Sequence, residues 1–159
     1  METKRNREII MKKKILLFSV VGLLVACSDE PATSADPQNK TAVVRNMDFA
    51  KISRGGKLFQ QNCAICHGRQ AEGAPNWQQM DDSGKFPPPP LNGSAHAWHH
   101  PKIVLVNTIK NGTAKSGGNM PAWKDKLSEE QINDIIIWFQ SKWSDEIYSA
   151  WYLADQGFR

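Results

Sequence analysis

The 159-residue sequence is short of cysteine and of long apolar runs. Its three cysteines include no second pair that could complete a zinc knuckle around Cys63 and Cys66. The longest largely apolar run, residues 15–26, falls short of the roughly 20 residues that a bilayer-spanning helix needs. No useful length of chain alternates apolar and polar residues, which argues against a sheet. What remains is a helical protein in which each cysteine needs its own explanation.

Excess positive charge is also missing from most of the chain. The whole sequence carries a net charge of +4 and a pI near 9.0, values that ordinarily suggest nucleic acid or an acidic surface as a partner. Six basic and two acidic residues precede Cys27, which leaves 14 of each from Cys27 onward. The basic character therefore belongs to the N-terminal leader, and nucleic acid is excluded as a partner.

The leader has the pattern of an export signal. Three lysines at residues 12–14 precede the apolar run 15–26, as in a secretory signal peptide. Residues 24–27 resemble the bacterial lipobox, in which the thiol of Cys27 is acylated and the chain is cut just before it. This predicts a lipoprotein signal peptide over 1–26, with a plain secretory signal as the alternative. Residues 27–47 are rich in small and polar residues and predict a flexible tether, followed by a domain over 48–159.

The other two cysteines stand in a C-x-x-C-H motif at residues 63–67. This motif attaches c-type haem, because two residues between Cys63 and Cys66 let one helical turn present both thiols to the two vinyl groups of one porphyrin edge. The adjacent His67 then ligates the iron. A redox disulfide would need a thioredoxin-like βαβ pattern, which the surrounding sequence lacks.

The second axial position of the iron has several candidates. Met120 is favoured because it stands in a Gly-rich loop and is followed by Pro121, which stiffens the segment. It lies 53 residues beyond His67, which is enough chain to return to the opposite haem face. Ligation by His and Met leaves no open position and favours electron transfer over catalysis. The other candidates are Met47, Met80, His96, His99 and His100, or no protein ligand at all.

Taken together, these motifs resemble the small mono-haem class I cytochromes c. The resemblance spans residues 48–143 and implies an all-α fold of about three to five helices wrapped around one covalent haem c. It also implies that the first and last helices cross, with Gly56 permitting close approach near Phe59. The recurrent landmarks are residues 55–62, 63–68, 90–93 and 119–123.

Two helices can be predicted from the chain itself. Ser128 and Gln131 form a capping box. Pro101 can open a middle helix that runs through Lys110 and ends at residues 111–112. Residues 145–152 extend past the usual final helix and have no assigned place. The apolar face of the last helix comprises Ile132, Ile135, Ile136, Phe139 and Trp143.

The resemblance further implies that a proline carbonyl accepts a hydrogen bond from the second nitrogen of His67. Pro89 or Pro90 would supply this carbonyl, and the four prolines at residues 87–90 leave the choice open. Leu91 would pack on the porphyrin.

The histidines at residues 96, 99 and 100 have two interpretations. His96 and His100 are spaced for one helical turn and could bind copper or zinc. The favoured interpretation is a loop near the haem edge, where the Trp98 N–H or a histidine bonds a propionate. Haem ligation by two histidines, one of them from this cluster, is a weaker alternative.

The sequence thus predicts an electron carrier rather than an enzyme. Its haem would cycle between Fe(II) and Fe(III) on the periplasmic side of a bacterial membrane, anchored by lipid at Cys27. The partners would be a quinol-oxidising complex, a terminal oxidase or a dehydrogenase. The alternatives are a haem peroxidase-like enzyme and a copper-binding or sensing module.

Overall fold

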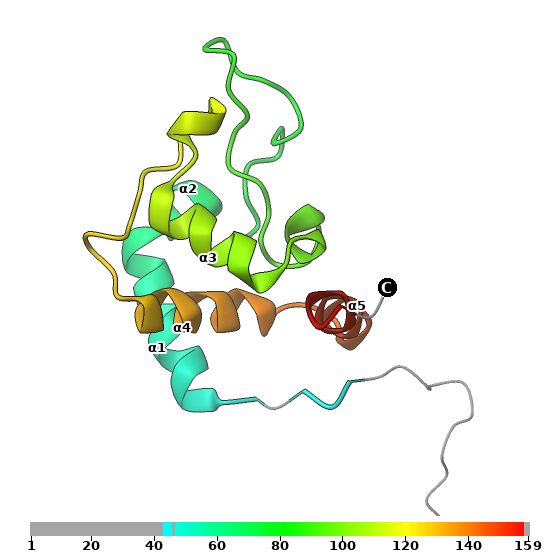
Figure 1. The fold of residues 1–159 in the computed structure, drawn as a ribbon. Helices are drawn as coiled ribbons and strands as arrows, with labels where there is room; N and C mark the ends of the chain where they lie inside the picture. Colours follow the sequence, from blue (N-terminus) through cyan, green and yellow to red (C-terminus); the bar gives the residue numbers. More distant parts are fainter. Residues whose placement is uncertain (1–42, 46, 158–159) are drawn as a thin grey trace, which may run out of the picture. The chain divides into compact units, whose positions relative to one another are not determined.

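The computed structural model of the chain describes residues 43–45 and 47–157. These residues form five α-helices and two short 3-10 helices, and no strand occurs among them (Figure 1). The predicted all-α fold of about three to five helices is therefore confirmed. The elements are α1 (Phe49–Asn62), α2 (Ala64–His67), η1 (His96–His99), α3 (Lys102–Asn111), η2 (Ala114–Ser116), α4 (Glu129–Gln140) and α5 (Asp145–Asp155).

Several sequence-based predictions fall on other parts of the chain. The signal peptide over 1–26, the acylated Cys27 and most of the tether over 27–47 lie outside the described residues, so these boundaries stay predictions. Within the described part, none of the helices has the length and apolar character that a bilayer crossing requires.

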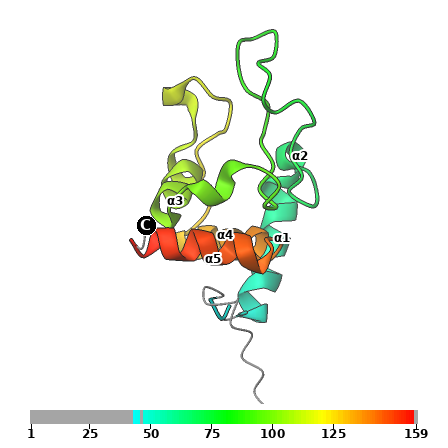
Figure 2. The same ribbon diagram turned by 90° about the vertical axis from the view of Figure 1, so that its right-hand side faces the viewer.

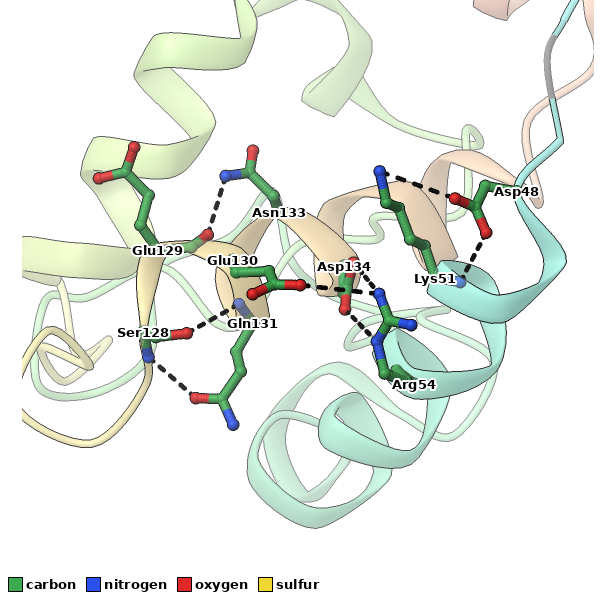
Figure 3. Close-up of polar contacts among 9 residues, drawn as sticks. All are labelled: Asp48, Lys51, Arg54, Ser128, Glu129, Glu130, Gln131, Asn133 and Asp134. Atoms are coloured by element: carbon green, nitrogen blue, oxygen red, sulfur yellow. Dashed lines mark hydrogen bonds and ion pairs between the residues drawn. The ribbon is translucent and has the colours of Figure 1, made fainter.

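Side-chain caps mark where the long helices begin. Asp48 accepts a hydrogen bond from the Lys51 N–H at 3.0 Å, and this bond lowers the pKa of the Asp48 carboxyl. The predicted capping box of α4 is confirmed: Ser128 Oγ accepts from the Gln131 N–H, and Gln131 Oε1 accepts from the Ser128 N–H (Figure 3). Ser144 Oγ caps α5 by accepting a hydrogen bond from the Ile147 N–H.

The crossing of α1 and α4 forms the centre of the core. Gly55 is buried there, and a Cβ on it would overlap the carbonyl oxygen of Asp134. Phe59, one turn further on, is fully buried and lies 4.4 Å from the Trp138 ring, centroid to centroid. Gly56 permits the expected close approach, against the Trp138 side chain of α4, and the two backbones themselves meet one residue earlier, at Gly55.

An ion pair at the same crossing joins the two helices (Figure 3). Arg54 Nε donates to the Asp134 carboxylate at 2.9 Å, and that carboxylate is only 3% exposed. Hydrogen bonding to Asp134 raises the pKa of the Arg54 guanidinium. The buried carboxylate of Asp134 is therefore paired with the half-exposed guanidinium of Arg54.

The segment before α1 contacts the corner between α4 and α5. Residues 43–45, 47 and 48 are called the strap here. Arg45 donates to the carbonyl oxygens of Trp143 and Ser144 at 3.1 and 3.0 Å, and its guanidinium lies 4.2 Å above the Tyr148 ring. The Val43 N–H donates to Ser149 Oγ at 3.0 Å. The end of the predicted tether is thus hydrogen-bonded to the domain.

The unassigned C-terminal segment is helix α5, which also contacts η1 (Figure 2). Trp151 Nε1 donates to the carbonyl oxygen of His100 at 3.0 Å. The Lys102 N–H at the start of α3 donates to Asp155 Oδ1 at 2.7 Å. Helix α5 therefore connects the strap with the loop that precedes α3.

Candidate haem site

The two cysteines of the motif lie at the junction of α1 and α2. Cys63 ends α1, and its carbonyl oxygen accepts from the N–H groups of Cys66 and His67 at 3.1 and 2.9 Å. This single turn brings both thiols and the imidazole to one end of α1. Cys66 is exposed, Cys63 is half-buried, and burial raises the pKa of the Cys63 thiol to about 11.

The ring of His67 is buried and oriented by a backbone carbonyl. Its Nδ1 lies 3.0 Å from the carbonyl oxygen of Pro89. Because a carbonyl can only accept, Nδ1 carries the hydrogen and Nε2 keeps its lone pair. Burial lowers the pKa of the ring, which favours the neutral form that a metal requires. Of the two prolines expected to supply this carbonyl, the structure selects Pro89.

Contacts with the chain that follows α2 hold the Pro89 carbonyl in place. The Ala74 N–H donates to the Pro88 carbonyl at 2.9 Å, and the Leu91 N–H donates to the Ala71 carbonyl at 2.7 Å. Gly73 has φ +68°, and a Cβ on it would overlap the backbone between Pro89 and Pro90. Sequence reasoning missed Gly73. Its position six residues after His67, with the proline run still ahead, was the available signal.

The two residues that follow Pro89, namely Pro90 and Leu91, pack into the domain. Pro90 is buried, and Leu91 is half-buried against the hydrophobic core. The carbonyl of Leu91 accepts from Trp143 Nε1 at 2.8 Å, which ties this segment to the end of α4.

The loop that carries Met120 is tied to the end of α3. The Thr113 N–H donates to the Met120 carbonyl, and the Met120 N–H donates to Thr113 Oγ1, both at 3.0 Å. The Met120 side chain is half-buried and packs against the core. Gly112 has φ +66°, and a Cβ on it would crowd the Met120 and Pro121 backbone. Two hydrogen bonds to Thr113 and the close approach at Gly112 therefore position this methionine. Its ligation of iron stays a prediction.

The histidine cluster differs from the helical turn that its spacing suggested. His96 and His99 are the first and last residues of η1, whereas the backbone of His100 is extended. The ring centroids of His96 and His100 lie 5.4 Å apart, and Trp77 stacks on His96 at 5.2 Å. Among the described residues, no three histidine, cysteine or carboxylate side chains gather as they would around a metal ion. The propionate contacts expected of Trp98 and the histidines stay predictions.

The donor set fits a covalently attached haem. Two thiols share one turn, and the adjacent imidazole is neutral, oriented and buried. Ile65, between the cysteines, is 92% exposed, so the turn itself lies at the surface.

Comparison with known proteins supports this assignment. The family model described as "Cytochrome C oxidase, cbb3-type, subunit III" matches residues 50–139, more than half of the chain. The chain belongs to this family. It is accordingly a mono-haem class I c-type cytochrome whose cofactor is one covalent haem c. The match includes α1 to α4 and the C-x-x-C-H turn, and it excludes the strap and α5.

The relatives are of two kinds. The chain is 34% identical to "Cbb3-type cytochrome c oxidase subunit CcoP" of Azospirillum sp. (strain B510) over 91 residues, which are 57% of this chain and 28% of that protein. It is 29% identical to "Cytochrome c-551" of Bacillus subtilis (strain 168) over 140 residues, 83% of this chain and 99% of that protein. "Cytochrome c6" of Leptolyngbya boryana is 29% identical over 58% of this chain and 94% of its own length.

The chain therefore spans under a third of the length of that oxidase subunit and nearly all of the small cytochromes. No solved structure matches it significantly.

Proposed function

We propose that this protein is a one-electron carrier whose haem iron is ligated by His67 and Met120. Haem c supplies a couple that exchanges one electron between Fe(II) and Fe(III). The observation that carries the proposal is the 3.0 Å contact between His67 Nδ1 and the Pro89 carbonyl, which leaves Nε2 free for iron and fixes the ring orientation. The support for Met120 is that its loop is hydrogen-bonded to Thr113 and its side chain is partly buried against the core.

The ligand pair favours electron transfer over catalysis, because it leaves no open coordination position for a substrate. The relatives include both small cytochromes and oxidase subunits, and the chain covers 99% of one small cytochrome and 28% of one oxidase subunit. A terminal oxidase is the partner class that the oxidase relatives support. A quinol-oxidising complex or a dehydrogenase would be the electron donor to the carrier.

We infer that the domain works on the periplasmic side of a bacterial membrane, held by lipid on Cys27. The support is the sequence: lysines at 12–14, the apolar run 15–26 and the lipobox-like residues 24–27. Acylation would hold the protein stably on the membrane. Mass measurement of the mature protein tests this, because acylated Cys27 at a new N-terminus has a defined mass that a Cys27→Ser variant lacks.

Spectra of the haem-loaded protein test the ligand pair. We expect a low-spin oxidised spectrum with a weak far-red Met–iron band that Met120→Ala abolishes. Met80→Ala is the matched control, because Met80 is 61% exposed in the loop after α2, and we expect its spectrum to be unchanged. High-spin haem in the unaltered protein, with ready binding of carbon monoxide or cyanide, would refute six-coordination and favour a peroxidase-like activity.

A further inference from the structure

Three apolar side chains lie exposed where the chain enters the domain. Val44 in the strap is 94% exposed, Phe49 at the start of α1 is 76% exposed, and Tyr152 of α5 is 37% exposed. A groove of about 370 Å³ lies between the strap, α1 and α5, and Met47, Ile52 and Tyr152 are among its lining residues. Val44 and Phe49 are the direct neighbours of the groove-lining residues Arg45 and Asp48, and we call Val44, Phe49 and Tyr152 the basal surface.

The strap holds Val44 outward. Its neighbours on both sides are fixed to α5 and to the end of α4: Val43 by its bond to Ser149, and Arg45 by its carbonyl contacts. The Arg45 side chain is only 11% exposed, so alternate residues of this extended segment face the protein and the solvent. Exposure of Val44 is thus imposed by the fold and is not a loose chain end.

The charge around the basal surface is balanced. Asp48 and Lys51 form an ion pair at 3.7 Å, and Arg45 is paired with Asp145 at 3.5 Å. Three side chains are too few for a stable protein–protein interface, which buries roughly 1,200 Å² or more. They suit a weak contact that becomes effective when a tether raises the local concentration.

The chain ahead of the basal surface indicates what it contacts. Residues 28–42 separate Val43 from Cys27, and the tether predicted from the sequence would span about 21 Å on average over that length. Lipid on Cys27 would therefore keep the basal surface within reach of the bilayer. We propose that the basal surface rests on a lipid bilayer, an inference that depends on the lipid anchor proposed above.

The contact would orient the haem. The strap joins one end of α1, whereas Cys63 lies at the other end, about 21 Å away along the 14-residue helix. The loop of residues 75–86 lies opposite the strap in both views (Figures 1 and 2). With the basal surface on the lipid, the cysteine-bearing turn points away from the membrane, where a partner can reach it.

Hydrogen exchange of the acylated, haem-loaded protein on phosphatidylcholine vesicles tests the contact. We expect amides of residues 43–52 to exchange on the order of tenfold more slowly on vesicles than in the form that begins at residue 28 and lacks lipid. Val44→Asp/Phe49→Asp should abolish this protection. Met80→Asp/Phe86→Asp is the matched control, because both residues are exposed in the loop at the opposite end, and it should keep the protection.

A second experiment tests the basal surface independently of the lipid anchor. The form that begins at residue 28, given an N-terminal hexahistidine tag, is bound to vesicles that contain nickel-chelating lipid. Protection of residues 43–52 there supports the basal surface even if Cys27 proves not to be acylated. Exchange that is the same on and off both kinds of vesicle overturns the proposal, as does protection that survives Val44→Asp/Phe49→Asp or appears only after a protein partner is added.

Discussion

Two of the contacts between distant parts of the chain differ in how they are made. At the α1–α4 crossing, Gly55 and the Asp134 carbonyl meet at the backbone, beside the fully buried Phe59. At the strap–α5 contact, the main element is the guanidinium of Arg45 on backbone carbonyls and on the Tyr148 ring. The first contact depends on the absence of a side chain, and the second depends on the full length of one.

The family match follows the same division. Residues 50–139 include the α1–α4 crossing and the haem motif, whereas the strap and α5 lie outside them. The crossing therefore belongs to the shared frame that carries the haem turn. The strap–α5 contact is an addition that connects the N-terminal segment to this frame, and we expect it to be the weaker of the two.

The largest expected effect is at Gly55. Gly55→Ala forces α1 away from α4 and should lower the free energy of unfolding by about 3 kcal/mol, measured by urea unfolding of the haem-loaded protein. Gly56→Ala is the control. Its Cβ would lie 2.8 Å from the Trp138 ring, which can shift, and alanine favours a helix by about 1 kcal/mol over glycine. Equal losses for both variants would contradict the assignment of the backbone contact to Gly55.

Removal of the guanidinium should weaken the second contact alone. Arg45→Ala is expected to lower the unfolding free energy by about 2 kcal/mol, because charged hydrogen bonds to partly buried carbonyls are lost. The haem spectrum should stay unchanged. Arg45→Lys keeps the charge but lacks the planar guanidinium group. Its unfolding free energy should lie between those of the unaltered protein and Arg45→Ala. A haem spectrum that changes in Arg45→Ala would show that the strap and the haem frame are not independent.

A smaller effect is expected at Ser149, which is buried and accepts the Val43 N–H. Ser149→Ala should lower the unfolding free energy by about 1 kcal/mol. In a double-mutant cycle with Arg45→Ala, the double variant should lose less unfolding free energy than the sum of the two single losses. The reason is that either change alone frees the strap. Strict additivity would mean that Val43 and Arg45 are held separately.

The smallest effect concerns pH. Burial, followed by the nearby His100 and His99, lowers the pKa of His96 below its usual 6.5. The neutral ring is thus favoured in the folded protein, so its contribution to stability is present above pH 6.5 and is lost as pH falls through the lowered pKa. Titration by NMR should show this low value, and His100→Ala should raise it. The strap–α5 contact has no histidine among its bonded groups, so its stability should not change over this pH range.

Much of the frame could be predicted because its signals are local. The capping box at Ser128 and the helix opened by Pro101 lie within a few residues of the elements they define. The cysteine motif and the methionine loop are likewise short patterns. The close approach at Gly56 was predicted, but the backbone contact at Gly55 was not, since the two glycines are adjacent and local sequence does not say which one meets the α4 backbone.

The strap could not be predicted for a physical reason. Arg45 binds carbonyls 95 to 99 residues away, and every residue offers a carbonyl, so the partner positions have no sequence signature. The place of α5 was hidden in the same way. Trp151 donates to the backbone of His100, and only the folded chain brings the two together.

The bonds of Arg45 also decide how the domain bears mechanical load. Tension applied to the chain ahead of Val43 reaches the Arg45 guanidinium and the Val43–Ser149 bond before it reaches α1. The load then passes into α5 and the end of α4, away from the turn that carries Cys63 and His67. Under tension on the tether, the bonds of the strap would therefore break first. The N-terminal segment would detach while the haem turn keeps its geometry.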